Sequence, residues 1–370
     1  QRNGKQTSVG FTISADDFPI DDRIANSLSG PVRKAYLNRR MRGRARLNKV
    51  RVLFHLADDG KAFESEFRGD IEARDIYMDV GLPGGQSVEH LTGTVSITQG
   101  TANAEGGRMS GQLHDARFEL SNHQIHGINS RFEINPSKLT LRNLTFQTAG
   151  GTIRGGSSAD PRSFEYQFTD RGKIYAYMNY QGLRLRELLK NEALAHSKVR
   201  GICNGKVIIH ELDGGDFLDM RASGDIGVHD GRLGTVPLFS AIYKHIKEDK
   251  RPQFTMGRVE FIVKERKVLL REFNVRSNLI KVEGEGTLDM DGYMDIDLNV
   301  PRLFGSAANI LILPPLLNEV FAKIVRFKVY GYIRDPKIDH LMPFSPGFAR
   351  QSLAPIPPVP LASGPRSSSK

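Results

Sequence analysis

The sequence predicts a mainly β protein made of many short strands, each with one apolar face. Three observations support this prediction: apolar and polar residues alternate over most of the chain, glycine is frequent with 37 residues, and one long segment is repeated. Alternation with a period of two is typical of strands that bury one face. Frequent glycine suits many turns and close strand approaches. The apolar fraction of 39% also fits strands with one solvated face.

The clearest strand pair is expected in residues 282–300, VEGEGTLDMDGYMDIDLNV. Its even positions are mostly apolar and its odd positions mostly polar, and Asp291-Gly292 interrupts the alternation as a turn. A three-residue loop of Met290, Asp291 and Gly292 keeps the apolar residues on one face. It pairs Leu288 with Met294 and Val282 with Val300, with Gly284 and Gly286 opposite Leu298 and Ile296.

This hairpin also carries six carboxylates within 15 positions, which raises the question of a cation site. An EF-hand loop needs a D-x-D-x-D-G start and a glutamate at its twelfth position. Counted from Asp289, the twelfth residue is Val300, so the spacing does not fit. The acidic side chains are interpreted as the solvated face of the hairpin, with no metal ligands assigned.

An internal repeat favours an extended array of sheet units. The segment RFEINPSKLTLRNLTFQTAGGTIRGG begins at Arg131, and EFIVKERKVLLREFNVRSNLIKVEGE begins at Glu260, an ungapped offset of 260 − 131 = 129 residues. Phe132 matches Phe261, Leu141 matches Leu270, and Ile153 matches Val282. Repeated sheet units that each leave one face uncovered usually stack on one another.

Four regions are expected along the chain. Residues 1–42 form a linker and one helix, residues 43–180 a first β-repeat region, residues 181–342 a second β region with short helices, and residues 343–370 a disordered tail with seven prolines. Helical spacing of apolar residues predicts short helices over Leu183–Ala195, Val236–Lys247 and Leu316–Val325. No apolar run is long enough to span a bilayer, and the start at Gln1 without Met is interpreted as that of a fragment or processed chain.

A basic segment accounts for nearly all of the net charge of +10, with nine basic residues and no acid from Arg33 to Arg51. Such a patch suits anionic lipid head groups or nucleic acid, or is a solvated helix end that runs into a strand. No nucleic-acid-binding signature accompanies it, so no nucleic-acid partner is assigned. The residues expected to contact phosphate head groups are Arg39, Arg40, Arg42, Arg44 and Arg46.

No catalytic or cofactor motif is present in the sequence. The nucleophile elbow, the Walker loop, the dinucleotide fingerprint and H-E-x-x-H are all absent. His123 and His126 point to opposite faces of a strand, which does not suit one shared metal ion. Cys203, the single cysteine, is interpreted as a buried and inert thiol. The protein is therefore expected not to be an enzyme and to need no cofactor.

Residues 224–300 resemble the C-terminal region of the AsmA-like family of bacterial envelope proteins. The resemblance rests on GDIGVHDGRLG, on VPLFSAIYKHI, and on the strand–turn–strand cadence that ends in GEGTLDMDGYMDIDLNV. VYGYIRDPKI at residues 329–338 is similar to the last strand of that family, and DDFPIDDRIANSLSGPVRKAYLNRRMRGRAR is similar to its helical linker. The better match covers about 120 residues, and these loose patterns of apolar and glycine positions indicate fold better than activity.

The resemblance implies an extended, twisted antiparallel β-groove, shaped like a taco shell, whose concave face is apolar. It also implies a periplasmic protein with an inner-membrane anchor upstream, which carries phospholipid or another acyl lipid and contributes to outer-membrane biogenesis. Matching positions on the apolar parity give the lipid-binding set Val259, Phe261, Val263, Val268, Leu270, Val282, Leu288, Met294, Ile296 and Leu298, and the repeat adds Phe132, Ile134, Leu139 and Leu141.

The residues by themselves leave open what covers the apolar face. A second sheet would close it as a sandwich, whereas acyl chains would cover it in a groove, with helices such as the one expected at 236–247 plugging or gating it. The two alternatives differ in function. The groove predicts a lipid carrier, and the closed core predicts a structural module of the envelope with protein partners.

Overall fold

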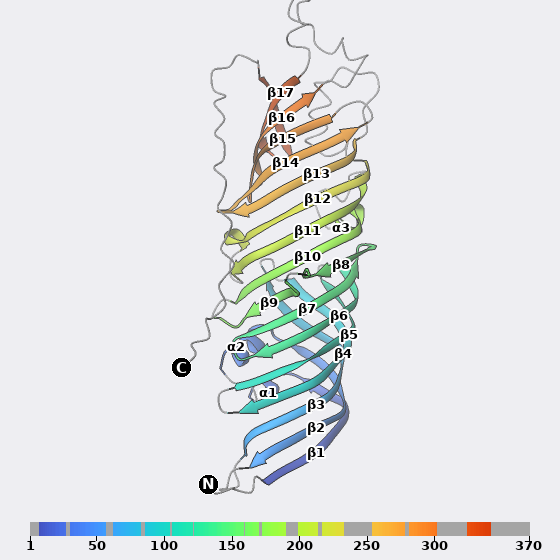
Figure 1. The fold of residues 1–370 in the computed structure, drawn as a ribbon, viewed down its shortest axis with the longest axis vertical. Coiled ribbons are helices and arrows are strands. Elements are labelled where there is room, and N and C mark those ends of the chain that lie inside the picture. Colours follow the sequence, from blue (N-terminus) through green and yellow to red (C-terminus); the bar gives the residue numbers. More distant parts are fainter. Residues whose placement is uncertain are drawn as a thin grey trace, which may run out of the picture.

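The computed structural model describes residues 7–26, 30–56, 62–82, 86–103, 106–120, 122–158, 160–169, 172–189, 199–213, 217–232, 254–277, 281–301 and 324–341. In these ranges the chain forms one antiparallel sheet of 18 strands (Figure 1). The strands are β1 Thr7–Ile20, β2 Arg42–Leu56, β3 Ala62–Leu82, β4 Gln86–Asn103, β5 Gly106–Leu120, β6 His123–Asn135, β7 Lys138–Thr148, β8 Gly151–Gly155, β9 Arg162–Gln167, β10 Lys173–Arg184, β11 Arg200–Asp213, β12 Arg221–Arg232, β13 Phe254–Lys264, β14 Lys267–Ser277, β15 Lys281–Asp289, β16 Tyr293–Pro301, β17 Ile324–Tyr332 and β18 Asp335–Leu341.

The described helices are short: α1 Asp22–Ala25, α2 Gly30–Asn38, α3 Leu185–Leu188 and the 3₁₀ turn η1 Phe217–Asp219. Asp21 caps α1 by accepting a hydrogen bond from the Arg23 backbone N–H at 3.0 Å. Helices α1 and α2 lie between β1 and β2 in the sequence. Strands β1 and β2 nevertheless pair directly with each other.

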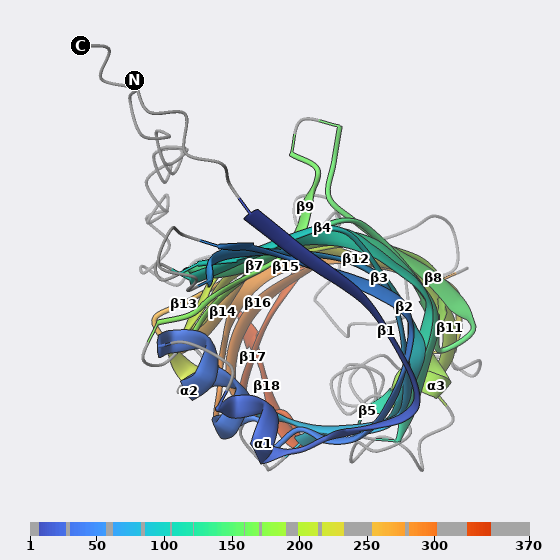
Figure 2. The same ribbon diagram turned by 90° about the horizontal axis from the view of Figure 1, so that it is seen from below.

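The sheet is a meander in which each strand from β1 to β7 and from β10 to β18 pairs with the next one in sequence. The short strands β8 and β9 both lie between β7 and β10 in the sheet. Each of them pairs with β7 on one side and with β10 on the other. Seen along its long axis, the sheet curls around a central space (Figure 2). The protein is thus mainly β, with one extended antiparallel sheet that forms a groove, as the resemblance of residues 224–300 implied.

Two structural expectations from the sequence are confirmed in detail. Strands β15 and β16 pair Leu288 with Met294, Gly286 with Ile296 and Gly284 with Leu298. Gly292 closes the loop with φ +92°, and its N–H donates to the Asp289 carbonyl at 2.9 Å. The repeat also holds in the pairing, because Phe132 faces Leu141 on β6 and β7 as Phe261 faces Leu270 on β13 and β14.

The expectations for the chain ends and helices hold only in part. Residues 7–20 were predicted as linker, which is wrong because they form β1. The predicted helix Leu183–Ala195 is helical at Leu185–Leu188, and β10 extends to Arg184 before it. The predicted helix Val236–Lys247, residues 316–323 of the third helix and the tail lie outside the described residues, and Ile324 and Val325 belong to β17. The boundary expected at residue 180 falls within β10, and the sheet continues across it.

Aromatic rings lie over glycines of neighbouring strands along the apolar face. A Cβ atom at Gly100 would lie 2.3 Å from the Phe67 ring, one at Gly111 2.8 Å from the Phe132 ring, and one at Gly224 2.9 Å from the Phe261 ring. Side chains on a concave face converge, so a ring fits there only if its neighbour is small. The glycines therefore allow the sheet to curl with large apolar residues inside.

Candidate functional site: the apolar face of the sheet

All fourteen residues of the predicted lipid-binding set share one face of the sheet. Directly opposed residues of paired strands share a face, and so do residues two apart along a strand. On β6 and β7 the register pairs Phe132 with Leu141 and Ile134 with Leu139. On β13 to β16 the pairs are Phe261–Leu270, Val263–Val268, Val268–Leu288 and Leu288–Met294, with Val259, Val282, Ile296 and Leu298 on the same face.

The apolar face continues through the strands that the sequence analysis did not assign to the site. One row of directly opposed residues runs from β1 to β10, and it contains Phe11, Val52, Phe67, Gly100, Met109, Ile134, Leu139, Tyr166 and Ile174. The residues of β1 were missed because residues 1–42 were expected to be a linker. The alternation of Val9, Phe11 and Ile13 with Ser8, Gly10 and Thr12 was the available signal.

The two ends of the apolar face differ in exposure. On β1, the side chains of Val9, Phe11 and Ile13 are 49%, 47% and 37% exposed. On β15 to β17, Val282, Leu298 and Val329 are at most 1% exposed and belong to one buried cluster. Leu185 and Leu189, at helix α3, pack against this cluster. The apolar face is therefore open at β1 and covered at β15 to β17.

The five arginines expected to hold head groups do not lie together. Arg39, at the end of α2, donates a hydrogen bond to the Tyr166 hydroxyl at 3.2 Å, and its guanidinium lies 5.5 Å from the Tyr166 ring centroid. Tyr166 belongs to the apolar face, opposite Leu139 and Ile174. Arg39 thus contacts a residue of the apolar face that is 127 positions away in sequence.

Arg42, Arg44 and Arg46 point the other way, because they alternate with Ala45 and Leu47 on β2. Arg44 forms an ion pair with Asp17, and Arg46 forms one with Asp16 at 3.0 Å. The structure therefore places these three side chains on the polar face, away from the apolar face of the groove. Arg40 is exposed in the turn after α2.

The polar groups of the described residues do not form a pocket that suits catalysis. Ser8 Oγ lies 3.1 Å from His55 Nδ1, and His55 Nε2 lies 3.1 Å from Glu66 Oε1, in a line across β1, β2 and β3. These are contacts between neighbouring strands on the solvated polar face. Among the described residues, no group of three or more His, Cys, Asp or Glu side chains is placed to hold a metal ion. Cys203 is 2% exposed, and burial raises the pKa of its thiol to about 11.

The acidic side chains of the hairpin range from exposed, as at Glu285 and Asp291, to half-buried, as at Asp297. Asp295 pairs with Lys328 at 3.1 Å, and Lys281 pairs with Glu283. Asp297 has a buried Oδ1 atom without a hydrogen-bond partner, and burial raises the pKa of its carboxyl group. Asp295 therefore contacts a lysine across strands, from β16 to β17, whereas Glu283 contacts a lysine of its own strand, β15.

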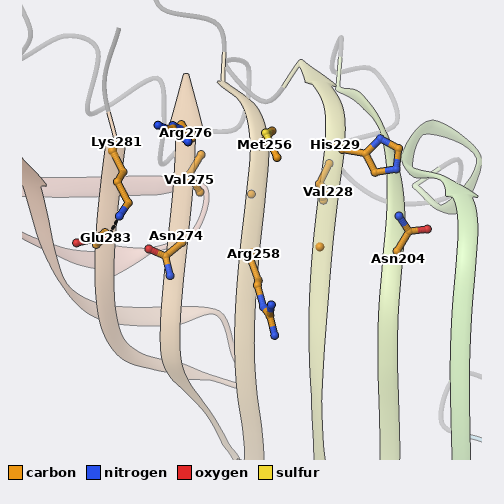
Figure 3. Close-up of a pocket in the computed structure, with 12 residues that line it drawn as sticks. Asn204, Val228, His229, Met256, Arg258, Asn274, Val275, Arg276, Lys281 and Glu283 are labelled. Atoms are coloured by element: carbon orange, nitrogen blue, oxygen red, sulfur yellow. Dashed lines mark ion pairs between the residues drawn. The ribbon is translucent and has the colours of Figure 1, made fainter. Parts of the chain in front are cut away.

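Two pockets open among the described residues of the polar face. The larger, about 520 Å³, lies across β11 to β15 and contains the exposed Met256 side chain (Figure 3). Most of its charges are compensated, since Arg258 pairs with Glu260 at 2.8 Å, His229 with Asp230 at 3.0 Å, and Lys281 with Glu283. The smaller, about 340 Å³, lies across β2 to β4 and contains Arg51 and Arg68.

Comparison with known proteins adds no relative: no family model, no curated protein and no solved structure matches this chain. Within the described residues, no helix has the length and apolar character needed to cross a bilayer. The apolar face of the sheet is therefore the feature on which a functional proposal depends.

Proposed function

We propose that the protein is a non-enzymatic envelope protein that carries phospholipid or another acyl lipid along the apolar face of its β-groove. The observation that carries this proposal is the apolar row through the register of the sheet, from Phe11 on β1 to Ile174 on β10. Ala176, Ile209 and Ala222 connect it across β10, β11 and β12 to Val263 on β13. Hydrocarbon side chains in such a row offer no fixed polar partner, which suits an acyl chain that slides.

The energetics support binding without a specific polar contact. Each buried CH₂ group contributes about 0.8 kcal/mol, so even part of an acyl chain is held firmly on an apolar surface. Side chains such as Val9 and Phe11, which are about half exposed, provide that surface at the β1 end. The resemblance of residues 224–300 to the AsmA-like family supports the same function, a periplasmic location, and a role in outer-membrane biogenesis with an upstream membrane anchor.

A second candidate function is a scaffolding module of the envelope with a closed core and protein partners. The buried cluster on β13 to β17, with Leu185 and Leu189 packed against it, favours this alternative for the C-terminal part of the sheet. A closed core would contain no lipid, whereas a carrier would retain lipid during purification.

The test is native mass spectrometry with lipid extraction on protein purified without detergent. We expect stoichiometric lipid on the wild-type protein and a large loss in Phe11→Asp, because a carboxylate on the apolar face excludes acyl chains. Thr12→Asp is the matched control, since Thr12 is the adjacent exposed residue on the polar face of β1, opposite Arg51. It should retain lipid.

Substitutions in the buried cluster would test folding instead of lipid binding. Ile296 is 4% exposed, so Ile296→Asp is expected to destabilise the sheet by several kcal/mol. Absence of lipid from repeated preparations of well-folded wild-type protein would reject the carrier and favour the closed-core scaffold. Equal loss of lipid in Phe11→Asp and Thr12→Asp would reject binding on the apolar face.

A further inference from the structure

Arg51 on β2 and Arg68 on β3 lie directly opposite each other on the polar face of the sheet. Directly opposed side chains on neighbouring strands are about 5 Å apart at Cβ, and like charges in such a pair are destabilising. Both arginines are exposed, and neither side chain forms an ion pair or hydrogen bond within the part of the chain that the structure describes. The pair therefore leaves two positive charges uncompensated.

Four other opposed basic pairs in the described residues have a carboxylate partner on at least one member. These opposed pairs are Arg44–Arg74, Arg131–Arg142, Lys264–Lys267 and Arg276–Lys281. In the same order, the ion pairs that compensate them are Arg44–Asp17, Arg142–Glu133, Lys267–Asp289 and Lys281–Glu283. Arg200 and Arg232 form a further opposed pair with no described carboxylate partner, but they do not line either pocket described above. Arg51 and Arg68 thus combine uncompensated charge with a pocket.

The pocket beside Arg51 and Arg68 offers neutral hydrogen-bond donors as well. A bulge in β4 between Ile97 and Gly100 brings Gln99 opposite the Arg68 region, and Thr101 lies opposite Glu66. The hydroxyl of Thr98, in the same bulge, donates to the Ser110 carbonyl at 3.1 Å. Its volume of about 340 Å³ exceeds the roughly 30 Å³ that one water molecule occupies in liquid. Guanidinium, hydroxyl and amide groups around such a space suit a phosphate group.

Glu66 is the one acidic residue that lines this pocket, and its carboxylate contacts His55. His55 Nε2 lies 3.1 Å from Glu66 Oε1, and His55 Nδ1 lies 3.1 Å from Ser8 Oγ. Arg108 lies opposite Thr101 at the border of the pocket and adds a third exposed positive charge. The local charge around the pocket is therefore positive.

We propose that Arg51 and Arg68 form a binding site for a phosphomonoester group on the polar face of the sheet, with Gln99 and Thr101 as further donors. The ligand is either a soluble phosphomonoester or the head group of an anionic lipid in a membrane surface. This site is separate from the apolar face, so the proposal does not depend on lipid carriage.

The test uses the purified chain in phosphate-free buffer. Isothermal titration calorimetry and thermal unfolding are measured with inorganic phosphate and glycerol 3-phosphate, at constant ionic strength. We expect both anions to bind and to raise the Tm of the wild-type protein. Arg51→Gln and Arg68→Gln should each weaken binding by about tenfold or more, since a charge-assisted hydrogen bond is lost. Without anion, Arg68→Gln should leave Tm unchanged or slightly higher, because a repulsion is removed.

The matched control is the double variant Arg200→Gln/Arg232→Gln, which removes the same charge from an opposed pair outside the described pockets. It should bind phosphate as the wild type does, whereas Arg51→Gln/Arg68→Gln should not. Equal weakening in the two double variants would overturn the proposal, because it would reflect net charge alone. Failure of folded wild-type protein to bind any of the probes would also overturn it.

Flotation with vesicles distinguishes the two sources of the phosphate group. Phosphatidylcholine vesicles with and without phosphatidic acid are compared for the same variants. Binding that requires phosphatidic acid, Arg51 and Arg68, without binding of glycerol 3-phosphate, assigns the site to lipid head groups. Binding of glycerol 3-phosphate with the same variant pattern assigns it to soluble ligands.

Discussion

At the scale of single residues, the acidic hairpin shows how a sheet face distributes charge. Glu285 on β15 and Lys328 on β17 lie directly opposite Asp297 on β16, and Asp295 lies two positions away on the same strand. Burial raises the pKa of the Asp297 carboxyl group, and the negative charge of Asp295 raises it further, against the lowering effect of Lys328. The environment of the Asp297 carboxyl group therefore disfavours its ionised form.

Asp297→Asn should stabilise the protein at neutral pH. A carboxyl group whose pKa is raised on folding stabilises the folded state below its unfolded pKa, and that contribution is lost as pH rises through the folded pKa. The ionised Asp297 therefore costs stability at pH 7, and the amide removes that cost, by up to about 1 kcal/mol. Chemical unfolding at pH 7 should show the gain.

The same measurement well below pH 3.8, the ordinary aspartate pKa, should show no gain because the carboxyl group is then mostly neutral in both states. Asp291→Asn is the control, since Asp291 is an exposed turn residue on the same hairpin. A loss of stability in Asp297→Asn at pH 7 would mean that the carboxylate has a favourable partner and that burial does not dominate.

At the scale of strands, glycines on the apolar face make room for large side chains. Gly224 and Gly227 both lie on β12, three residues apart and therefore on opposite faces. A Cβ atom at Gly224 would lie 2.4 Å from the Lys206 carbonyl oxygen and 2.9 Å from the Phe261 ring, whereas one at Gly227 would lie 3.5 Å from the Asn204 carbonyl oxygen. The two positions thus differ in what a methyl group would meet.

Gly224→Ala should destabilise the protein by about 1–3 kcal/mol, because backbone and ring must move to admit the methyl group. Gly227→Ala should be near neutral, since its contact is of ordinary van der Waals length and alanine reduces the entropy of the unfolded chain. Urea unfolding of both variants checks the prediction. Equal effects would show that the ring over Gly224 is not needed for the curl of the sheet.

At the scale of the whole molecule, the groove is open at one end of the sheet and covered at the other. The exposed side chains of β1 and the buried cluster of β13 to β17 lie at opposite ends of the strand order in Figure 1. Helix α3 and the leucines around it follow β10, near the middle of the chain, and pack against the covered part. A lipid that enters the resting protein should therefore meet β1 to β3 first.

A photoactivatable fatty acid should label residues 7–82 more strongly than residues 281–301. Exposed apolar surface is present on β1, and acyl chains are excluded where Val282, Leu298 and Val329 are already covered. Irradiation followed by peptide mapping by mass spectrometry measures the distribution, and Phe11→Asp should reduce the label on β1 to β3. Label concentrated on β15 to β17 would show that the covered part opens to lipid.

Local pattern was sufficient to predict most strands and the hairpin register. Alternation predicts which residues share a face, and the requirement for an odd loop predicted the pairing of Leu288 with Met294. The same rule placed the fourteen lipid-binding candidates on one face. It failed at β1, because residues 1–42 were interpreted as a linker and one helix and the short alternation of Val9, Phe11 and Ile13 was not used.

The sequence by itself determined that this protein is a β protein with one apolar sheet face, because side-chain period and turn chemistry are local properties. Only the tertiary structure decided how that face is used. Four features depend on strands or helices that come together from distant positions in the sequence. They are the curl of the sheet, the covering of β15 to β17, the contact of Arg39 with Tyr166, and the opposition of Arg51 and Arg68. Periodicity along one strand carries no information about which neighbour bulges, which end is covered, or which charges meet across the sheet.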